Sequence, residues 1–256
     1  MFEPKPQITL QKAGKKFNLN LARKESALFR CLNFFSSKDR NKDEFWALRN
    51  ITLNPRKGSI VGLIGKNGSG KSTLLKMIAG IYQPDEGMIK TEGEIVYLTG
   101  FGQGIMPKLT MKENIYLIGT LLGLNKKEID EKYEEIVEFS ELKNYENSKI
   151  YQFSSGMVSR LSFSTTILCL KRKNPEILLI DEALDAGADL SFKNKALEKI
   201  EELIKGGATV IMASHDLATI EKYCDMVLWL EKGEVVKKSL PAEVIPEYIK
   251  ESQKNY

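Results

Sequence analysis

The stretch from residue 58 to residue 80, GSIVGLIGKNGSGKSTLLKMIAG, constrains the fold more than any other part of the chain. An apolar run from Ile60 to Ile64 ends at a glycine, small residues follow, and apolar residues recur at helical spacing after Lys71. The pattern predicts a strand, a tight loop and a helix. Within it, residues 65–72 match GxxxxGK followed by Ser or Thr, which is the pattern of a phosphate-binding loop.

The glycines of this loop let successive backbone N–H groups point into one hollow, and the following helix adds the positive end of its dipole. Such a hollow fits the phosphates of a nucleoside triphosphate. Lys71 is expected to reach the β- and γ-phosphates, and the Ser72 hydroxyl is expected to bind the accompanying Mg²⁺. A chance match is the alternative, which the flanking strand and helix disfavour. The predicted ATP-binding residues of the loop are Gly65, Lys66, Asn67, Gly68, Ser69, Gly70, Lys71, Ser72 and Thr73.

A second element, EILLIDE at residues 176–182, combines a buried strand with two carboxylates. Asp181 and Glu182 stand at the carboxyl end of the strand, where ligands of open α/β sheets collect. Asp181 is expected to hold Mg²⁺, directly or through water. Glu182 is expected to orient, or accept the proton of, the water that attacks the γ-phosphate. A strand that simply ends in charged residues is common, but the preceding phosphate loop favours the catalytic interpretation.

His215 is the only histidine of the chain and follows an apolar strand predicted from Ala208 to Ser214. At the end of a strand beside the nucleotide, its side chain can hydrogen-bond the γ-phosphate and respond to its loss. We therefore predict a catalytic role for His215 beside Glu182.

Three further candidates for the nucleotide site have weaker support from the sequence. Phe45 and Trp46 precede the loop by about twenty residues and could stack on adenine, although aromatic residues at the start of a strand more often pack in a core. The run from Ser154 to Gly156 offers hydroxyls and N–H groups to an anion, as any capped helix would. Gln103 lies in a glycine-rich link and carries an amide that could touch Mg²⁺ or the attacking water.

The rest of the chain alternates strands and helices, which predicts an α/β fold with a mostly parallel sheet. A strand is expected from Glu92 to Leu98, two helices lie between Met111 and Glu141, and a further helix runs from Val158 to about Lys171. The predicted organisation is an N-terminal β part at 1–57, a phosphate-loop core at 58–105 and 158–240, a helical subdomain at 106–157 and a C-terminal helix at 241–256.

An amphipathic helix with basic residues is predicted at about 21–35, inserted in the N-terminal β part. It could lie against a membrane surface or a membrane partner, or it could pack on the sheet, and the pattern favours neither.

Composition excludes several classes of function. The 38 basic and 34 acidic residues leave too small a positive charge to predict nucleic-acid binding. Cys31, Cys169 and Cys224 are odd in number and far apart, so they are expected to be reduced thiols rather than disulfides or metal ligands. The N-terminus lacks a signal-peptide profile and the apolar runs are too short to span a bilayer. Any membrane crossing is therefore expected to come from another chain.

The order of these motifs, from Phe45 to Val235, resembles the ATP-binding subunit of an ABC transporter. Four segments are similar to the branch that exports polysaccharides such as O-antigen, capsule or teichoic acid: FWALRNITL, LTMKENIYLIG, FSSGM followed by RLSFS, and VLWLEKGEV. Most other ABC proteins carry the signature LSGGQ, so Ser155 and Met157 depart from the wider family and fit this branch. The long segment before Phe45 fits the branch as well.

The resemblance implies a P-loop NTPase fold and a head-to-tail homodimer that uses ATP and Mg²⁺. Each ATP would lie between the phosphate loop of one chain and the signature of the other. Asp189 would belong to a loop that crosses the dimer, although LDAGAD is one residue out of step, and Gln103 stands later than the family's glutamine, with Phe101 nearer that place. The implied signature residues are Phe153, Ser154, Ser155, Gly156 and Met157.

The resemblance also implies a polytopic membrane permease as partner, a lipid-linked polysaccharide as substrate, and a location on the cytoplasmic face of the membrane. No C-terminal carbohydrate-binding domain is expected before Tyr256, so substrate selection would lie with the permease or with the 21–35 segment. The alternatives are a soluble ABC ATPase acting on ribosomes or DNA, and a regulatory module that binds ATP without turnover. The presence of the loop lysine, both carboxylates and the histidine disfavours the latter.

Overall fold

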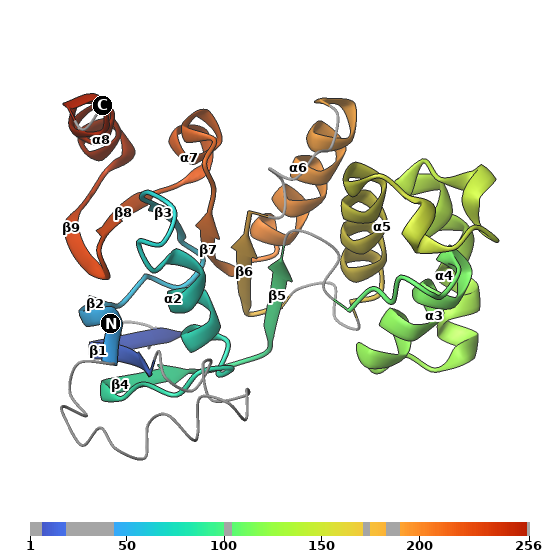
Figure 1. The fold of residues 1–256 in the computed structure, drawn as a ribbon, viewed down its shortest axis with the longest axis horizontal. Helices are drawn as coiled ribbons and strands as arrows, with labels where there is room; N and C mark the ends of the chain where they lie inside the picture. Colours follow the sequence, from blue (N-terminus) through green and yellow to red (C-terminus); the bar gives the residue numbers. More distant parts are fainter. Residues whose placement is uncertain (1–6, 19–43, 100–103, 171–174, 183–189, 255–256) are drawn as a thin grey trace, which may run out of the picture.

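A computed structural model describes residues 7–18, 44–99, 104–170, 175–182 and 190–254 of the chain (Figure 1). In these ranges the chain forms a central parallel sheet, a smaller antiparallel sheet and a group of helices set to one side. The segment predicted as an amphipathic helix at 21–35, with Cys31, lies outside the described residues, as do Phe101, Gln103 and Asp189.

The central sheet has six strands in the order β5-β6-β7-β3-β8-β9. The first five strands run parallel and only β9 is antiparallel, which confirms the predicted mostly parallel α/β fold. Apolar layers cover both faces of the parallel strands, so these strands read as continuous apolar runs in the sequence. Their bounds are β3 Ile60–Ile64, β5 Ile95–Thr99, β6 Ile177–Asp181, β7 Thr209–Ala213, β8 Met226–Glu231 and β9 Glu234–Ser239.

An antiparallel sheet with strand order β2-β1-β4 packs with helix α2, Lys71–Ile78, on one face of the central sheet. Its strands are β1 Ile8–Asn18, β2 Glu44–Leu53 and β4 Glu86–Thr91. The strand predicted from Glu92 to Leu98 is wrong in its start, because β5 begins only at Ile95. The preceding strand, β4, is not predicted from the sequence. The chain leaves the antiparallel sheet and turns at Gly93, whose φ is +103°, before it enters the parallel sheet as β5.

Three helices, α3 Met111–Leu121, α4 Lys126–Ser140 and α5 Ser155–Leu168, form the group at the right of Figure 1. Capping boxes begin the first two: the side chains of Thr110 and Glu113 bond each other's backbone N–H, and Asn125 and Glu128 do the same. These local signals explain why the sequence predicts both helices closely. Two 3₁₀ turns, Lys143–Tyr145 and Ile150–Gln152, lead to α5.

Helix α5 begins three residues before the predicted start at Val158. The Ser154 hydroxyl accepts a hydrogen bond from the Met157 N–H at 3.2 Å, so Ser154 is the N-cap and the Ser-Gly-Met run is already helical. Buried residues of α5, such as Leu161, share a core with buried residues of α3 and α4. We propose that the helical subdomain continues to the end of α5 rather than ending at residue 157.

The remaining helices are α6 Leu190–Lys205, α7 Leu217–Tyr223 and α8 Pro241–Lys254. Helix α8 packs on the sheet through Tyr248, whose ring lies edge-to-face against Trp229 of β8, with 5.5 Å between the ring centroids. None of the helices in the described ranges is both long and apolar enough to cross a bilayer. Cys169 and Cys224 are buried free thiols, and burial raises their pKa to about 11 and about 12.

Candidate functional site

The phosphate-binding loop connects β3 to α2, as predicted. Gly65 and Gly70 have φ of +149° and +108°, which residues with side chains rarely adopt. A Cβ atom on Gly65 would lie 2.2 Å from the Leu230 carbonyl oxygen, and one on Gly70 would lie 2.8 Å from the Ala47 carbonyl oxygen. The neighbouring backbone therefore allows only glycine at these two turns of the loop.

Lys71 is buried beneath this loop, with 5% of its surface exposed. Its ammonium Nζ donates a hydrogen bond to the Gly65 carbonyl oxygen at 2.8 Å. Burial lowers the pKa of Lys71, and the negative charges of Glu182 and Asp181 oppose that shift. The structure thus holds a cation against the loop, where a phosphate would be its natural counter-ion.

Asp181 accepts hydrogen bonds on both carboxylate oxygens. The Ser72 hydroxyl donates to Oδ1 at 3.0 Å, and the Tyr97 hydroxyl donates to Oδ2 at 2.8 Å. Burial and the charge of Asp181 raise the pKa of Tyr97, so its phenol keeps the proton that it donates. Tyr97 is a site residue that the sequence reasoning missed, because its role depends on β5 lying beside β6.

The pair of Ser72 and Asp181 suits Mg²⁺. Both supply oxygen, which this hard cation prefers, and they lie 3.0 Å apart at the end of a strand. Within the described part of the chain, no three His, Cys, Asp or Glu side chains gather into a metal site. Two protein oxygens, with the remaining positions left to phosphates and water, are what a nucleotide-borne Mg²⁺ requires.

Glu182 and His215 meet at the ends of β6 and β7. The Glu182 N–H donates to the Ala213 carbonyl oxygen at 3.0 Å and Glu182 has a φ of +53°, so the chain turns sharply just after Asp181. His215 Nε2 lies 2.8 Å from Glu182 Oε1. Both side chains are partly exposed, so water and a phosphate can reach them.

Beside the loop lies a cavity of about 460 Å³. Phe45 lies at its wall, facing the same space as the loop, and is 50% exposed. Phe17, its partner across β1 and β2, lines the cavity too and was missed by the sequence reasoning. The full lining is Phe17, Phe45, Ala47, Asn67, Gly68, Gly70, Lys71, Ser72, Thr73 and Glu182.

Trp46 does not belong to this cavity lining. Successive side chains of a strand point to opposite faces, so Trp46 faces away from Phe45 and Ala47. Its ring lies beneath two cations, with Lys16 Nζ at 4.5 Å and the Arg49 guanidinium at 4.9 Å from the centroid. Of the two aromatic candidates, the structure thus brings only Phe45 to the phosphate loop.

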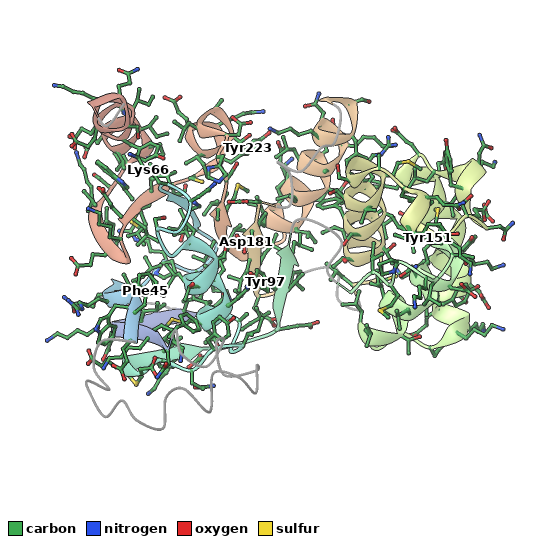
Figure 2. All side chains as sticks on the ribbon, in the orientation of Figure 1. Phe45, Lys66, Tyr97, Tyr151, Asp181 and Tyr223 are labelled. Carbon is green, nitrogen blue, oxygen red and sulfur yellow. The ribbon has the colours of Figure 1, made fainter. Side chains whose placement is uncertain are left out.

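Other loop residues differ in exposure. Lys66 and Asn67 are exposed, whereas Ser69 is buried beneath Gly65. Figure 2 shows Phe45, Lys66, Tyr97 and Asp181 on the elements around α2, while Tyr151 marks the distant helical group.

The signature residues lie with that helical group. Ser154 and Ser155 are exposed at the start of α5, and Phe153 packs edge-to-face on Tyr145 at 5.8 Å. None of the five, Phe153, Ser154, Ser155, Gly156 and Met157, lines the cavity beside the phosphate loop. The structure therefore does not bring the signature and the loop of one chain into one pocket.

Comparison with known proteins identifies the family of this chain. The family model described as "ABC transporter" matches residues 48–185. A teichoic acids export ATP-binding protein of Lactococcus lactis is 39% identical over 246 residues, which are 96% of this chain and 51% of that protein. An O-antigen export system ATP-binding protein of Myxococcus xanthus is 37% identical over 97% of this chain and 56% of its own length. This chain thus spans about half the length of these two relatives.

A second O-antigen export system ATP-binding protein, from Klebsiella pneumoniae, is 41% identical over 73% of this chain and 74% of its own length. Two solved structures share the fold. The ATP-binding subunit of an ABC transporter has a TM-score of 0.70 at 23% identity, covering 94% of this chain and 93% of that one. A dimeric ATP-binding cassette with ADP and Pi has a TM-score of 0.71 at 22% identity, covering 91% of this chain and 98% of that one. The chain belongs to the ABC transporter family, in the branch represented by ATP-binding proteins of O-antigen and teichoic acid export.

Proposed function

We propose that this chain hydrolyses ATP and thereby drives the export of a lipid-linked polysaccharide through a separate membrane subunit. The observation that carries the proposal is the cavity beside the phosphate loop, where Lys71, Glu182 and an aromatic wall meet in one space. Asp181 and His215 contact two residues of its lining, Ser72 and Glu182 respectively. These residues would bind the adenine, the phosphates and the Mg²⁺ of the nucleotide, and Glu182 would be the base for hydrolysis.

ATP binding would use the cavity from end to end. Adenine stacks on the aromatic pair Phe17 and Phe45, which lie opposite each other on neighbouring strands. The loop N–H groups and the amino end of α2 receive the phosphates. Lys71 exchanges its bond to the Gly65 carbonyl for bonds to the β- and γ-phosphates, because an anion is the stronger acceptor.

Ser72 and Asp181 are the residues that would hold Mg²⁺. When bound, the ion neutralises charge that develops on the β- and γ-phosphate oxygens. The protein's own part is to keep a hydroxyl and a carboxylate oxygen 3.0 Å apart at the end of β6, close to the phosphate loop.

Hydrolysis would use Glu182 and His215. The oxygen of a water attacks the γ-phosphorus, the bond from this phosphorus to the bridging oxygen of ADP breaks, and the water's proton passes to the Glu182 carboxylate. In the structure, His215 Nε2 lies 2.8 Å from Glu182 Oε1. With ATP present, we expect the histidine to turn to the γ-phosphate, which frees the carboxylate for the water.

A second copy of the chain would complete the site. Ser154 and Ser155 are exposed at the start of α5, where the positive end of the helix dipole suits a phosphate, yet they do not line the cavity of their own chain. A head-to-tail homodimer would set the signature of one chain over the ATP of the other. Closure on ATP and opening after hydrolysis would then move the membrane partner.

The export function is supported by the names of the relatives, which describe O-antigen and teichoic acids export. A peripheral position on the cytoplasmic face, bound to a polytopic permease, follows from that function. The soluble alternative, action on ribosomes or DNA, receives no support from these relatives.

A trapped complex tests the proposal. In Glu182→Gln the base is lost while the binding residues remain, so a tagged full-length variant should hold ATP and keep its partners. We expect ATP-dependent capture of a polytopic membrane protein from detergent-solubilised native membranes, identified by mass spectrometry. The Lys71→Ala, Glu182→Gln double variant lacks the lysine that binds the phosphates, so its capture of the membrane protein should no longer depend on ATP. Capture of ribosomal proteins or DNA instead would contradict the export function and leave the ATP chemistry standing.

A further inference from the structure

Tyr97 fixes one of the two oxygens of the carboxylate at the end of β6. Its phenol donates to Asp181 Oδ2 at 2.8 Å, while Ser72 donates to Oδ1 at 3.0 Å. A carboxylate rotates freely about its last bond, because that torsion has broad minima. Two donors from different elements, β5 and α2, remove this freedom and set the plane of the carboxylate.

The register of the parallel strands explains how Tyr97 reaches its partner. Tyr97 lies beside Leu179, so the two share a face of the sheet, and Asp181 comes two residues later on that same face. Two residues of strand span roughly 7 Å, a length that the extended phenol side chain bridges diagonally. The ring is partly buried on the side of the sheet covered by α2.

We propose that Tyr97 is a positioning residue for the Mg²⁺ of the nucleotide: it holds Asp181 Oδ2 so that Oδ1 stays turned toward Ser72. This inference rests on the proposed ATPase function and deepens it. Tyr97 does not line the cavity beside the phosphate loop, so it acts through Asp181 rather than on the nucleotide. Loss of a partner that orients a metal ligand typically lowers the affinity for the metal.

The matched pair of variants is Tyr97→Phe and Tyr133→Phe. Each removes one phenol oxygen that donates to a carboxylate, since Tyr133 bonds Glu146 at 2.6 Å in the helical part, away from the nucleotide site. Phenylalanine preserves the packing of both rings. A general loss of stability from removing such a bond should therefore appear in both variants. A loss of metal affinity should appear only in Tyr97→Phe.

The measurement is metal affinity without turnover. Full-length protein is saturated with ADP, and bound Mn²⁺ is followed by electron paramagnetic resonance, while ADP affinity is measured separately in the presence of a chelator. For Tyr97→Phe we expect metal binding to weaken by about 10- to 100-fold, with chelated ADP affinity within about twofold of the wild type. Tyr133→Phe should match the wild type in both measurements.

Equal Mn²⁺ affinity in Tyr97→Phe and wild-type protein would overturn the proposal, even if both phenylalanine variants melt earlier. A loss of ADP affinity that is as large with chelator as with metal would also overturn it, because Tyr97 would then support the site as a whole. Failure of the wild-type protein to bind ADP at all would refute the proposed ATPase function, which is a different result from either of these.

Discussion

At the scale of single residues, three contacts organise the site: Lys71 with the Gly65 carbonyl, Ser72 with Asp181, and His215 with Glu182. In each contact a charged or polar group is satisfied by a neighbour that a phosphate or a metal ion would replace. For Lys71, which is buried, the bond to the Gly65 carbonyl matters most, because a buried charge without a partner is costly.

The same scale shows where sequence reasoning reaches its limit. Phe45 and Trp46 are adjacent and both aromatic, so composition alone does not choose between them. The strand does, because neighbouring residues point to opposite faces. Phe45 faces the phosphate loop, and Trp46 lies under Lys16 and Arg49.

We predict that Phe45→Ala weakens the binding of ATP more than the binding of inorganic tripolyphosphate. Loss of one base–aromatic stack should lower ATP affinity by about five- to fiftyfold, whereas tripolyphosphate, which has no base, should bind as before. The ratio of the two dissociation constants, measured by isothermal titration calorimetry, isolates stacking from stability. Trp46→Ala is the control and should leave this ratio unchanged; a ratio altered by Trp46→Ala rather than Phe45→Ala would assign adenine to the other aromatic residue.

At the scale of elements, a contact between Lys193 of α6 and Asp216, the N-cap of α7, lies next to His215. Asp216 follows His215 directly and caps α7, accepting hydrogen bonds from the Ala218 and Thr219 N–H groups. Lys193 of α6 reaches Asp216 Oδ2 at 2.5 Å. The Lys193 ammonium, followed by the Thr219 hydrogen bonds, lowers the pKa of Asp216 to about 2, against the opposing effect of burial.

This pair makes a contribution to stability that acid removes. Because the pKa of Asp216 is lower in the folded chain than in the unfolded chain, the contribution is complete above about pH 4 and disappears as the pH falls toward 2. We predict that Asp216→Asn, which keeps a capping side chain, lowers stability by about 0.5–1 kcal/mol at neutral pH, since the pair is partly exposed.

Melting temperatures of Asp216→Asn and wild-type protein, recorded from pH 7 to pH 2, provide the check. The difference between the two proteins should shrink below pH 4. Glu135→Gln, which removes one negative charge from an exposed residue of α4, serves as a control for the same change of net charge. A difference that stays constant down to pH 2 would show that the Lys193 contact does not act through the charge of Asp216.

At the scale of the whole molecule, the phosphate loop and the signature lie in different parts of the fold. The loop sits between the central sheet and α2, whereas Ser154 begins α5 in the helical group at the other side of the molecule (Figure 1). The caps and helices of that group would present the signature as a fixed surface. In the proposed homodimer, the signature of one chain and the phosphate loop of the other would act on one ATP.

We predict that Ser154→Asp blocks ATP-dependent dimerisation while the chain stays folded. Aspartate caps a helix as well as serine does, but its charge would face the γ-phosphate of the other chain, and such like-charge contacts cost several kcal/mol. In a Glu182→Gln background with ATP, the dimer should weaken at least about tenfold, as measured by light scattering after size-exclusion chromatography. Thr110→Asp makes the same change at the cap of α3 and should leave the dimer intact. An unaffected dimer in Ser154→Asp would remove the signature from the ATP interface.

The sequence by itself determined the phosphate loop, the two carboxylates and the lone histidine as candidates, because their chemistry depends on residue types at strand ends and on local spacing. Only the tertiary structure decided that Phe17 joins Phe45 at the cavity and that Tyr97 bonds Asp181. The first depends on how β1 pairs with β2 across a long segment. The second depends on β5 and β6 lying side by side, although 77 residues separate Thr99 from Ile177. Strand order is set by packing of the whole sheet, so no local pattern encodes it.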